Sequence, residues 1–173
     1  MADPNPMRRG VRLGVDVGSV RVGVARSDLT GLLATPIQTL QRTSSQDQVA
    51  EIASLARQLQ AVEVVVGLPR ALSGAHGAAA QDALAYATKV AHAVAPVPVR
   101  LVDERLTTVT AHQMLAHSAK SGRARRKIVD QVAAVVILQT ALDAERGTGR
   151  PAGDLIEIVP ENMVPGGEMK ETR

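Results

Sequence analysis

Valine-rich segments dominate the first forty positions and carry the short hydrophobic period of β-strands. Two such runs, 11–17 and 20–27, are separated by a glycine–serine pair at 18–19, which predicts a tight β-hairpin. A third run covers 32–40 and contains Pro36. Because proline cannot donate to a strand ladder, this strand is expected at a sheet edge or beside a bulge. The chain therefore opens with a predicted three-stranded meander.

Beyond this meander, helical and extended periods alternate. A helix is predicted from the capping candidates at 43–45 to Gln60, where apolar residues recur at helical spacing. The segment 62–67, VEVVVG, has the composition of a central strand that is covered on both faces. An alanine-rich helix is then predicted over 74–95, and a further strand over 99–103.

The last third of the chain is predicted to be mainly helical. A helix is expected over 107–117, a basic loop over 118–127, and a long helix over 127–145. The long helix is apolar nearly all round, so it should be buried against the sheet. From position 147 the composition turns to glycine, proline and charge, and within this tail LIEIV at 155–159 is a candidate short strand.

A meander followed by alternating helices and strands is typical of an α/β fold. The predicted architecture is a mixed five-stranded sheet flanked by helices. The length of 173 residues and an apolar content of 45% suit one domain with one core. We expect a flexible N-terminus at 1–10, the domain at 11–146, and a largely disordered tail at 147–173.

The composition narrows the kinds of chemistry available. The chain has no cysteine, which excludes disulfides, thiolate metal sites and a cysteine nucleophile, so a catalytic metal would need oxygen or imidazole ligands. There is no signal-peptide pattern, and the longest late apolar run, 132–138, is far too short for a membrane span. A soluble, cytoplasmic protein is the simplest expectation.

Positive charge is concentrated in two short segments, although the net charge is only +3. Such clusters suit the neutralisation of phosphates, and the alternative is a solvated surface that happens to be basic. Tyr86 is the only aromatic residue, so stacking platforms for bases are missing and recognition of a nucleic acid would rest on backbone and shape. The two clusters are Arg8, Arg9 and Arg12, and Lys120, Arg123, Arg125, Arg126 and Lys127.

Acidic residues at the ends of predicted elements are the strongest candidates for chemistry. Asp16 ends an apolar strand, where a carboxylate is costly unless it is paired or binds a cation, although it could also stabilise the hairpin turn. Alternation along the strand at 99–103 places Asp103 and Glu104 on opposite faces, so one of them can be structural. Asp130 falls in the first turn of the long helix, where a capping or dipole role is the simpler alternative.

Considered together, three acids gain a joint interpretation. Two carboxylates at the ends of parallel strands and one at the start of a helix packed on the same sheet can converge on one point. Oxygen ligands favour Mg²⁺ or Mn²⁺, and two such ions about 3.5 to 4 Å apart can promote in-line phosphoryl displacement. The four histidines lack the spacing of a metal-binding helix, and neither a Walker A motif nor a GxSxG elbow is present.

Four ordered motifs resemble the YqgF/RuvX family, relatives of the RuvC Holliday-junction resolvases within the ribonuclease H-like superfamily. The match extends through most of the segment from Arg12 to Leu142. The motifs are DVGSVRVGVARSD at 16–28, VVVGLPRALSG at 64–74, LVDERLTTVTA at 101–111 and KIVDQVAAVVILQ at 127–139.

The resemblance implies a ribonuclease H-like fold and a catalytic triad of Asp16, Glu104 and Asp130 that also binds the metal ions. The strand that ends in GLP lacks the acid that RuvC-type enzymes keep there, so the middle carboxylate must come from DER, and Asp103 remains an alternative to Glu104. The resemblance also implies that Arg21, Gly67, Pro69, Arg105 and Thr107 shape the site. The expected substrate-binding residues are Arg21, Arg105, Thr107, Arg123, Arg125, Arg126 and Lys127.

The family further implies a nuclease that acts in maturation of the 5′ end of pre-16S rRNA, with Holliday-junction resolution as the alternative. A non-catalytic nucleic-acid-binding module and an actin-like phosphotransferase are the competing classes, the last suggested by the first motif alone. Neither RNA nor DNA is selected by the sequence. A homodimer is left open, because a four-way junction invites two-fold symmetry whereas rRNA trimming does not require it.

Overall fold

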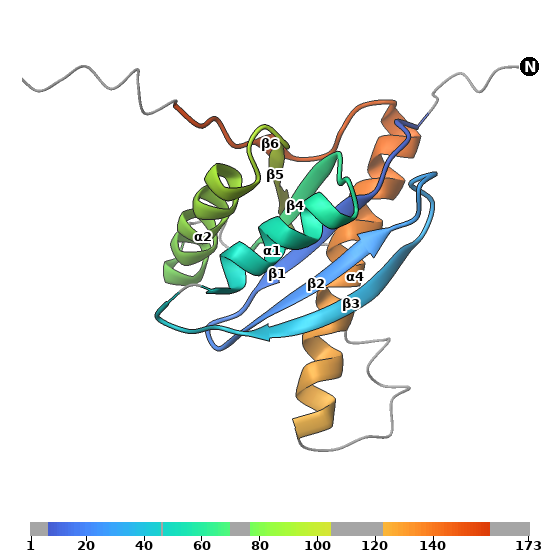
Figure 1. Cartoon of the computed structure of the whole chain (residues 1–173). Coiled ribbons are helices and arrows are strands. Elements are labelled where there is room, and N and C mark those ends of the chain that lie inside the picture. Colours follow the sequence, from blue (N-terminus) through green and yellow to red (C-terminus); the bar gives the residue numbers. More distant parts are fainter. Residues whose placement is uncertain (1–6, 46, 70–76, 105–122, 160–173) are drawn as a thin grey trace, which may run out of the picture.

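A computed structural model describes residues 7–45, 47–69, 77–104 and 123–159, and in 123–130 it describes the backbone only. Within these residues, six strands form one sheet and three helices pack on it (Figure 1). The strands are β1 (Arg12–Val17), β2 (Arg21–Ser27), β3 (Ala34–Gln41), β4 (Glu63–Leu68), β5 (Val99–Asp103) and β6 (Asp154–Leu155). The helices are α1 (Asp47–Gln58), α2 (Ala78–Val94) and α4 (Arg123–Thr148).

The sheet is mixed and has the order β3-β2-β1-β4-β5-β6. The first three strands form the predicted antiparallel meander, and β4 and β5 run parallel to β1. The predicted mixed α/β sheet is therefore confirmed, with six strands in place of five because the short β6 pairs antiparallel with β5. Of the candidate strand at 155–159, only Leu155 belongs to β6, and the other residue of β6 is Asp154.

Pro36 lies where its chemistry requires. It belongs to β3, the strand at one edge of the sheet, and its partner on β2 is Ala25. The ladder changes register between Val24 and Ala25, directly beside the proline. The missing donor is thus accommodated by an edge and an irregularity together, which are the two solutions that the sequence predicted.

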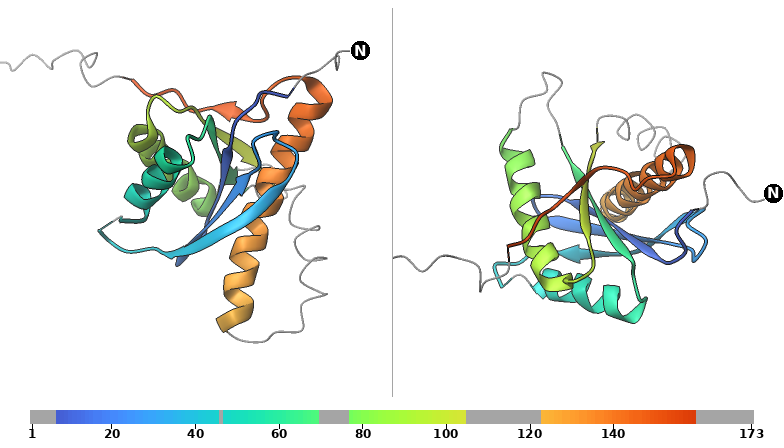
Figure 2. Two further views of the ribbon diagram at one scale, coloured as in Figure 1. Left: turned by 45° about the vertical axis from the view of Figure 1, so that its right-hand side comes forward. Right: turned by 90° about the horizontal axis from the view of Figure 1, so that it is seen from above.

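Helices cover both faces of the sheet, as the two views in Figure 2 show. One face packs on α1 and α2 through a core that includes Leu13, Val15, Val64 and Val66. The other face packs on α4 through a second core, to which the sheet contributes Ala25, Ala34, Val65 and Val102. Because β4 is buried on both faces, its continuous VEVVVG pattern is explained.

The long helix α4 begins earlier than expected. Its first residue is Arg123, so the second half of the predicted basic loop at 118–127 is helical and that prediction was wrong there. The cause is that arginine, alanine and lysine are good helix formers even when their charge suggests a loop. The predicted burial of this helix is confirmed for Ala134, Ile137 and Leu138. The helix expected at 107–117 lies outside the described residues.

The described segments include no helix with the length and apolar character needed to cross a bilayer. Beyond α4, the backbone runs back along the sheet, where the amide of Ile156 donates to the carbonyl of Val99 (2.9 Å). Part of the tail expected to be largely disordered is therefore attached to β5. The division of the chain at positions 10 and 146 stays a prediction.

Candidate active site

Asp16 and Glu104 meet on the α4 face of the sheet, although they are 88 positions apart in the chain. Asp16 is the fifth residue of β1, and Glu104 directly follows the last residue of β5. The strand β4 lies between these two strands. The side chain of Glu104 nevertheless reaches a hydrogen bond with that of Asp16, so the two carboxyl groups come together above β4.

Gly67 makes this meeting sterically feasible. It lies on β4, next to the strand that carries Asp16, and a Cβ atom at this position would overlap the Oε1 atom of Glu104 and crowd the Cδ1 atom of Ile137 on α4. The glycine therefore leaves the space that the Glu104 side chain occupies. Any larger residue would have to displace either the carboxyl group or the helix.

The environment raises the pKa of Glu104 to about 8 from an ordinary value of 4.5. Burial is the largest cause, followed by the negative charge of Asp16, the hydrogen bond with Asp16, and the charge of Asp103. A proton held between two carboxylates relieves their repulsion, and a cation placed between the same oxygens would do so as well. The pair thus has the electrostatic character of a cation site.

Strand alternation separates Glu104 from its neighbour Asp103. Val102 belongs to the core under α4, whereas Leu101 packs against the core on the opposite face. Glu104 shares the α4 face with Val102, which its contact with Gly67 confirms. Asp103 is half-buried on the α2 side of the strand. The two acids do point to opposite faces, as predicted, and Glu104 is the one beside Asp16.

The position of Asp130 follows from the way α4 crosses β1. Arg12 at the start of β1 is paired with Glu145, and Gly14 lies against Leu138 and the carbonyl of Ala134. Contacts thus move toward the start of the helix as β1 advances toward Asp16. Asp130 is one helical turn before Ala134, so its backbone lies next in this progression. The side chain of Asp130 lies outside the described residues.

A family model described as "RuvX: Holliday junction resolvase" matches residues 10–144 of this chain. The chain belongs to the RuvX family. The observed mixed sheet with helices on both faces agrees with the kind of fold that the resemblance to this family predicted. Asp16, Gly67, Glu104 and Asp130 all fall within the matched segment.

Curated relatives of this RuvX chain carry the name "Putative pre-16S rRNA nuclease". One from Leifsonia xyli is 53% identical over 87% of this chain and 97% of its own length. Another, from Thermobifida fusca, is 52% identical over 89% of this chain and its whole length. Among solved structures, RuvC of T. thermophilus in complex with a Holliday junction substrate is similar at 17% identity with a TM-score of 0.47, over 83% of this chain and 99% of that chain.

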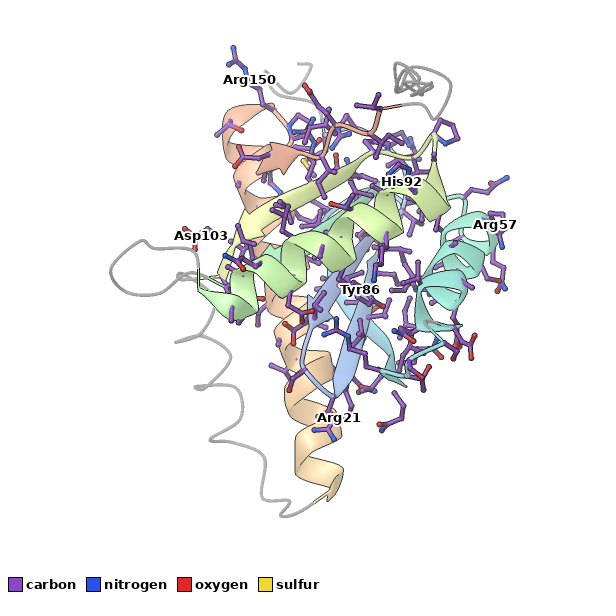
Figure 3. All side chains as sticks on the ribbon, turned by 90° about the vertical axis from the view of Figure 1, so that its left-hand side faces the viewer. Arg21, Arg57, Tyr86, His92, Asp103 and Arg150 are labelled. Carbon is purple, nitrogen blue, oxygen red and sulfur yellow. The ribbon has the colours of Figure 1, made fainter. Side chains whose placement is uncertain are left out.

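The remaining residues expected at the site of this RuvX protein are placed only in part. Arg21 is the first residue of β2, half-buried at the hairpin end of the sheet, where Figure 3 shows it far from Arg150. Pro69 directly follows β4 and is also half-buried. Arg105 and Thr107 lie outside the described residues. The backbone of Arg123, Arg125, Arg126 and Lys127 belongs to the first turns of α4, and their side chains are not described.

The N-terminal basic cluster has a structural role that the sequence did not indicate. Arg8 pairs with both Glu145 (2.8 Å) and Glu63 (3.1 Å), and the almost fully buried Arg12 pairs with Glu145 (3.2 Å). Arg100 contributes a further bond to Glu63 (3.1 Å). Two of the three arginines thus neutralise buried carboxylates, so the interpretation of this cluster as a phosphate contact was wrong for Arg8 and Arg12.

Asp28, the last residue of the first motif, organises a turn and lies away from the carboxyl pair. Its side chain accepts hydrogen bonds from the amides of Leu32 and Leu33 (2.8 Å each) and of Thr30 (3.1 Å). These bonds, led by that from Leu33 and by the hydroxyl of Thr30, hold the pKa of Asp28 well below its usual range. Asp28 therefore remains charged and shapes the β2–β3 connection.

Oxygen ligands for a hard divalent cation are present on the α4 face. Asp16 and Glu104 supply two carboxyl groups whose mutual repulsion a cation would relieve, which fits Mg²⁺ or Mn²⁺. Among the described side chains, no group of three or more acidic or histidine residues is placed to hold a metal ion. A third ligand from Asp130 would complete the set that the sequence predicts.

Sequence reasoning missed Arg42, which follows β3 and contacts the β1–β2 turn. Its guanidinium donates to the carbonyl of Gly18 (3.0 Å) and to both carboxylate oxygens of Asp82 on α2 (2.5 and 2.7 Å). A lone arginine after a strand carries no pattern that marks it. Only the fold shows that it touches the turn that begins two residues after Asp16.

Proposed function

We propose that this RuvX protein is a divalent-metal-dependent nuclease that hydrolyses phosphodiester bonds of structured nucleic acid, with the 5′ end of pre-16S rRNA as its main substrate. The observation that carries the proposal is the meeting of the Asp16 and Glu104 carboxyl groups above Gly67. Two half-buried carboxyl groups that repel each other at this distance are costly for folding, which favours a functional reason for the pair.

In the proposed mechanism, Asp16, Glu104 and Asp130 would hold Mg²⁺ or Mn²⁺. When bound, two such ions supply an activated water and stabilise the charge on the attacking and leaving oxygens. The contribution of the chain is to keep Asp16 and Glu104 in fixed positions against the rigid β4 strand, with Gly67 setting how deeply Glu104 can lie. To act as a metal ligand, Glu104 would have to be in its carboxylate form, so its proton would be released on binding.

Substrate contacts are proposed at the same end of the molecule. Arg21 lies at the hairpin end of the sheet, and the basic residues at the start of α4 precede Asp130 on the same helix. Arg105 and Thr107 follow Glu104 directly in the chain. Cations on both sides of the acids would contact phosphates that flank the scissile bond and fix the register of the backbone.

Pre-16S rRNA is favoured as the substrate because relatives that match this chain over nearly their whole length are named "Putative pre-16S rRNA nuclease". A four-way DNA junction is the second candidate, because the matching family is described by Holliday junction resolution. Tyr86, the only aromatic residue, is buried, so neither substrate would be recognised by base stacking. A homodimer and a cytoplasmic location remain predictions of the sequence.

A cleavage panel tests the proposal. End-labelled pre-16S rRNA with its 5′ leader, a four-way junction and unstructured single strands are incubated with the protein in Mg²⁺ or Mn²⁺. We expect cleavage of the precursor at a defined 5′ position and its loss in Asp16→Asn and Glu104→Gln. Asp103→Asn is the matched control, because it removes the neighbouring charge on the opposite face and should retain most cleavage.

Each alternative has its own result in this panel. Preferential cleavage of the junction would replace rRNA by DNA as the substrate. Tight binding of the precursor with no cleavage in either metal would overturn the nuclease proposal and leave a binding module. Equal loss of cleavage in Asp103→Asn and Glu104→Gln would remove the assignment of Glu104.

A further inference from the structure

Arg42 ties the β1–β2 turn to α2 with two groups at once. Its backbone amide donates to the carbonyl of Val20 (2.8 Å), and its guanidinium donates to the carbonyl of Gly18 (3.0 Å). The same guanidinium forms a two-pronged ion pair with Asp82, with distances of 2.5 and 2.7 Å. One side chain thus joins the β1–β2 turn to helix α2.

The guanidinium of Arg42 also lies over the aromatic ring of Tyr86. Its central carbon lies 5.2 Å from the centroid of Tyr86, one helical turn after Asp82 on α2. Tyr86 is buried in the core under α1 and α2, and burial raises its pKa to about 12, so it stays neutral. The bond with Asp82 raises the pKa of Arg42, so the arginine stays charged. Its geometry is therefore fixed on three sides.

This tether acts on the segment that carries Asp16. Gly18 is two residues after Asp16, and its own amide is bonded to the carbonyl of Arg21 (2.9 Å), which closes the turn. A Cβ atom on Gly18 would approach that carbonyl to 2.6 Å, so the turn is tightly closed. Arg42 holds this turn by two of its carbonyl groups and therefore limits the movement of the strand end that presents Asp16.

The anchor of the tether is connected to the other half of the site. The helix α2, which carries Asp82 and Tyr86, packs on β4 and β5 through Leu68, Ala80 and Ala83, with Leu101 against them. Leu68 is adjacent to Gly67, the residue against which Glu104 lies. Arg42 therefore couples the strand of Asp16 to the strands that position Glu104.

We propose that Arg42, anchored by Asp82 and Tyr86, is a positioning residue that sets the separation of the Asp16 and Glu104 carboxyl groups. The inference rests on the proposed function only in assuming that this pair binds a divalent cation. Arg42 touches neither carboxylate, and it acts through the backbone of the turn. Loosening the tether should allow the pair to spread and weaken its hold on the cation.

Calorimetric titration with Mn²⁺ alone tests this on the folded full-length protein. Arg42→Ala should weaken Mn²⁺ binding on the order of tenfold, as is typical when support behind a metal ligand is removed. Asp82→Asn keeps a hydrogen-bonding group in place and should give a smaller loss. Arg42→Lys keeps the charge without the two-pronged geometry and should lie between wild type and Arg42→Ala.

Arg146→Ala is the matched control. Arg146 also bonds a carboxylate, Asp143 (3.3 Å), and a loop carbonyl, that of Leu32 (3.3 Å), but it lies near the start of β1 and away from Asp16. Its loss should leave Mn²⁺ affinity unchanged. Thermal unfolding shows whether each variant is folded at the titration temperature. If Arg42→Ala is unfolded there, the comparison of Asp82→Asn with Arg146→Ala tests the inference.

Kinetics on the cleaved substrate supply a second readout. A positioning role predicts a lower kcat with an almost unchanged KM for nucleic acid, whereas a direct phosphate contact by Arg42 would raise KM. Mn²⁺ affinities of Arg42→Ala and Asp82→Asn that equal that of Arg146→Ala would overturn the inference. Failure of the proposed function would give another result. Wild type would then cleave no substrate, while the Mn²⁺ affinities of the variants would still follow the predicted order.

Discussion

Glu104 hydrogen-bonds Asp16 across β4, so two acids from strands that are not neighbours share one position above the strand between them. The contact depends on Gly67, which offers no side chain on that face. It also depends on α4, whose residue Ile137 closes the space above Gly67. The carboxyl pair is thus partly buried because β4 and α4 enclose it.

Replacing Gly67 by alanine should damage the site more than the fold. The added methyl group would overlap Glu104 and crowd Ile137, so we expect a loss of about 1–3 kcal/mol in stability from overpacking and at least a tenfold loss of cleavage. Urea unfolding and cleavage rates measure the two effects. Gly147→Ala, with open space around the new methyl group in α4, is the control and should be neutral or slightly stabilising. A fully active Gly67→Ala would contradict the proposed position of Glu104.

The stability of the metal-free protein should depend on pH through Glu104. Its pKa is about 8 in the folded state and near 4.5 when unfolded, so between these values the unfolded chain holds fewer protons. The stability that Glu104 contributes is therefore fully present below about pH 4.5 and is lost as pH rises to about 8. Glu104→Gln mimics the protonated form and should lack this loss.

Urea unfolding in EDTA at several pH values measures the effect. The stability advantage of Glu104→Gln over wild type should grow between pH 5 and pH 8 and then level off, reaching a few kcal/mol because each pH unit between the two pKa values is worth about 1.4 kcal/mol. An advantage that is the same at pH 5 and pH 8 would show that Glu104 is not held in a protonated form.

Glu145→Ala should be one of the most destabilising single changes on α4. It would leave the almost fully buried Arg12 without its carboxylate partner and remove two bonds from Arg8, at a cost of about 3–5 kcal/mol. Asp143→Ala removes an exposed pair from the same helix and should cost less than about 1 kcal/mol. Denaturation curves of the two variants, compared directly, would refute the assignment if the costs were similar.

Neutralising the basic start of α4 should change how binding depends on salt. If Arg123, Arg125 and Arg126 contact phosphates, the triple change to glutamine lowers the slope of log affinity against log salt by up to about three. The exposed arginines Arg9, Arg57 and Arg150, changed together, provide a control with the same loss of charge. Equal slopes for the two triple variants would show that the helix start is not at the interface.

The order of the elements was predictable because each had a clear hydrophobic period. The hairpin of β1 and β2, the edge position of Pro36 and the two-sided burial of β4 all follow from residue types that permit few alternatives. The start of α4 at Arg123 was not predictable from charge, since the same residues favour both a solvated loop and a helix. The two residues of β6 are too few to carry a period.

The site was predictable only as far as single strands determine it. Asp16 was marked by its position in an apolar strand, and alternation separated the faces of Asp103 and Glu104. Which of the two faces carries Asp16 depends on the packing of α4 and on Gly67, which are long-range relationships. The same holds for Arg12 and Arg42, whose partners lie far away in the chain.

Helix α4 is much longer than the strand that it crosses. Its 26 residues span about 39 Å, whereas the six residues of β1 span about 20 Å, and its first turns extend past the hairpin end of the sheet (Figure 1). The protruding part is a rigid arm that measures a fixed distance from the acids. Adding or removing one turn there would move the basic residues by about 5.4 Å along the helix axis relative to the acids. The packing of α4 against Gly14 would not change.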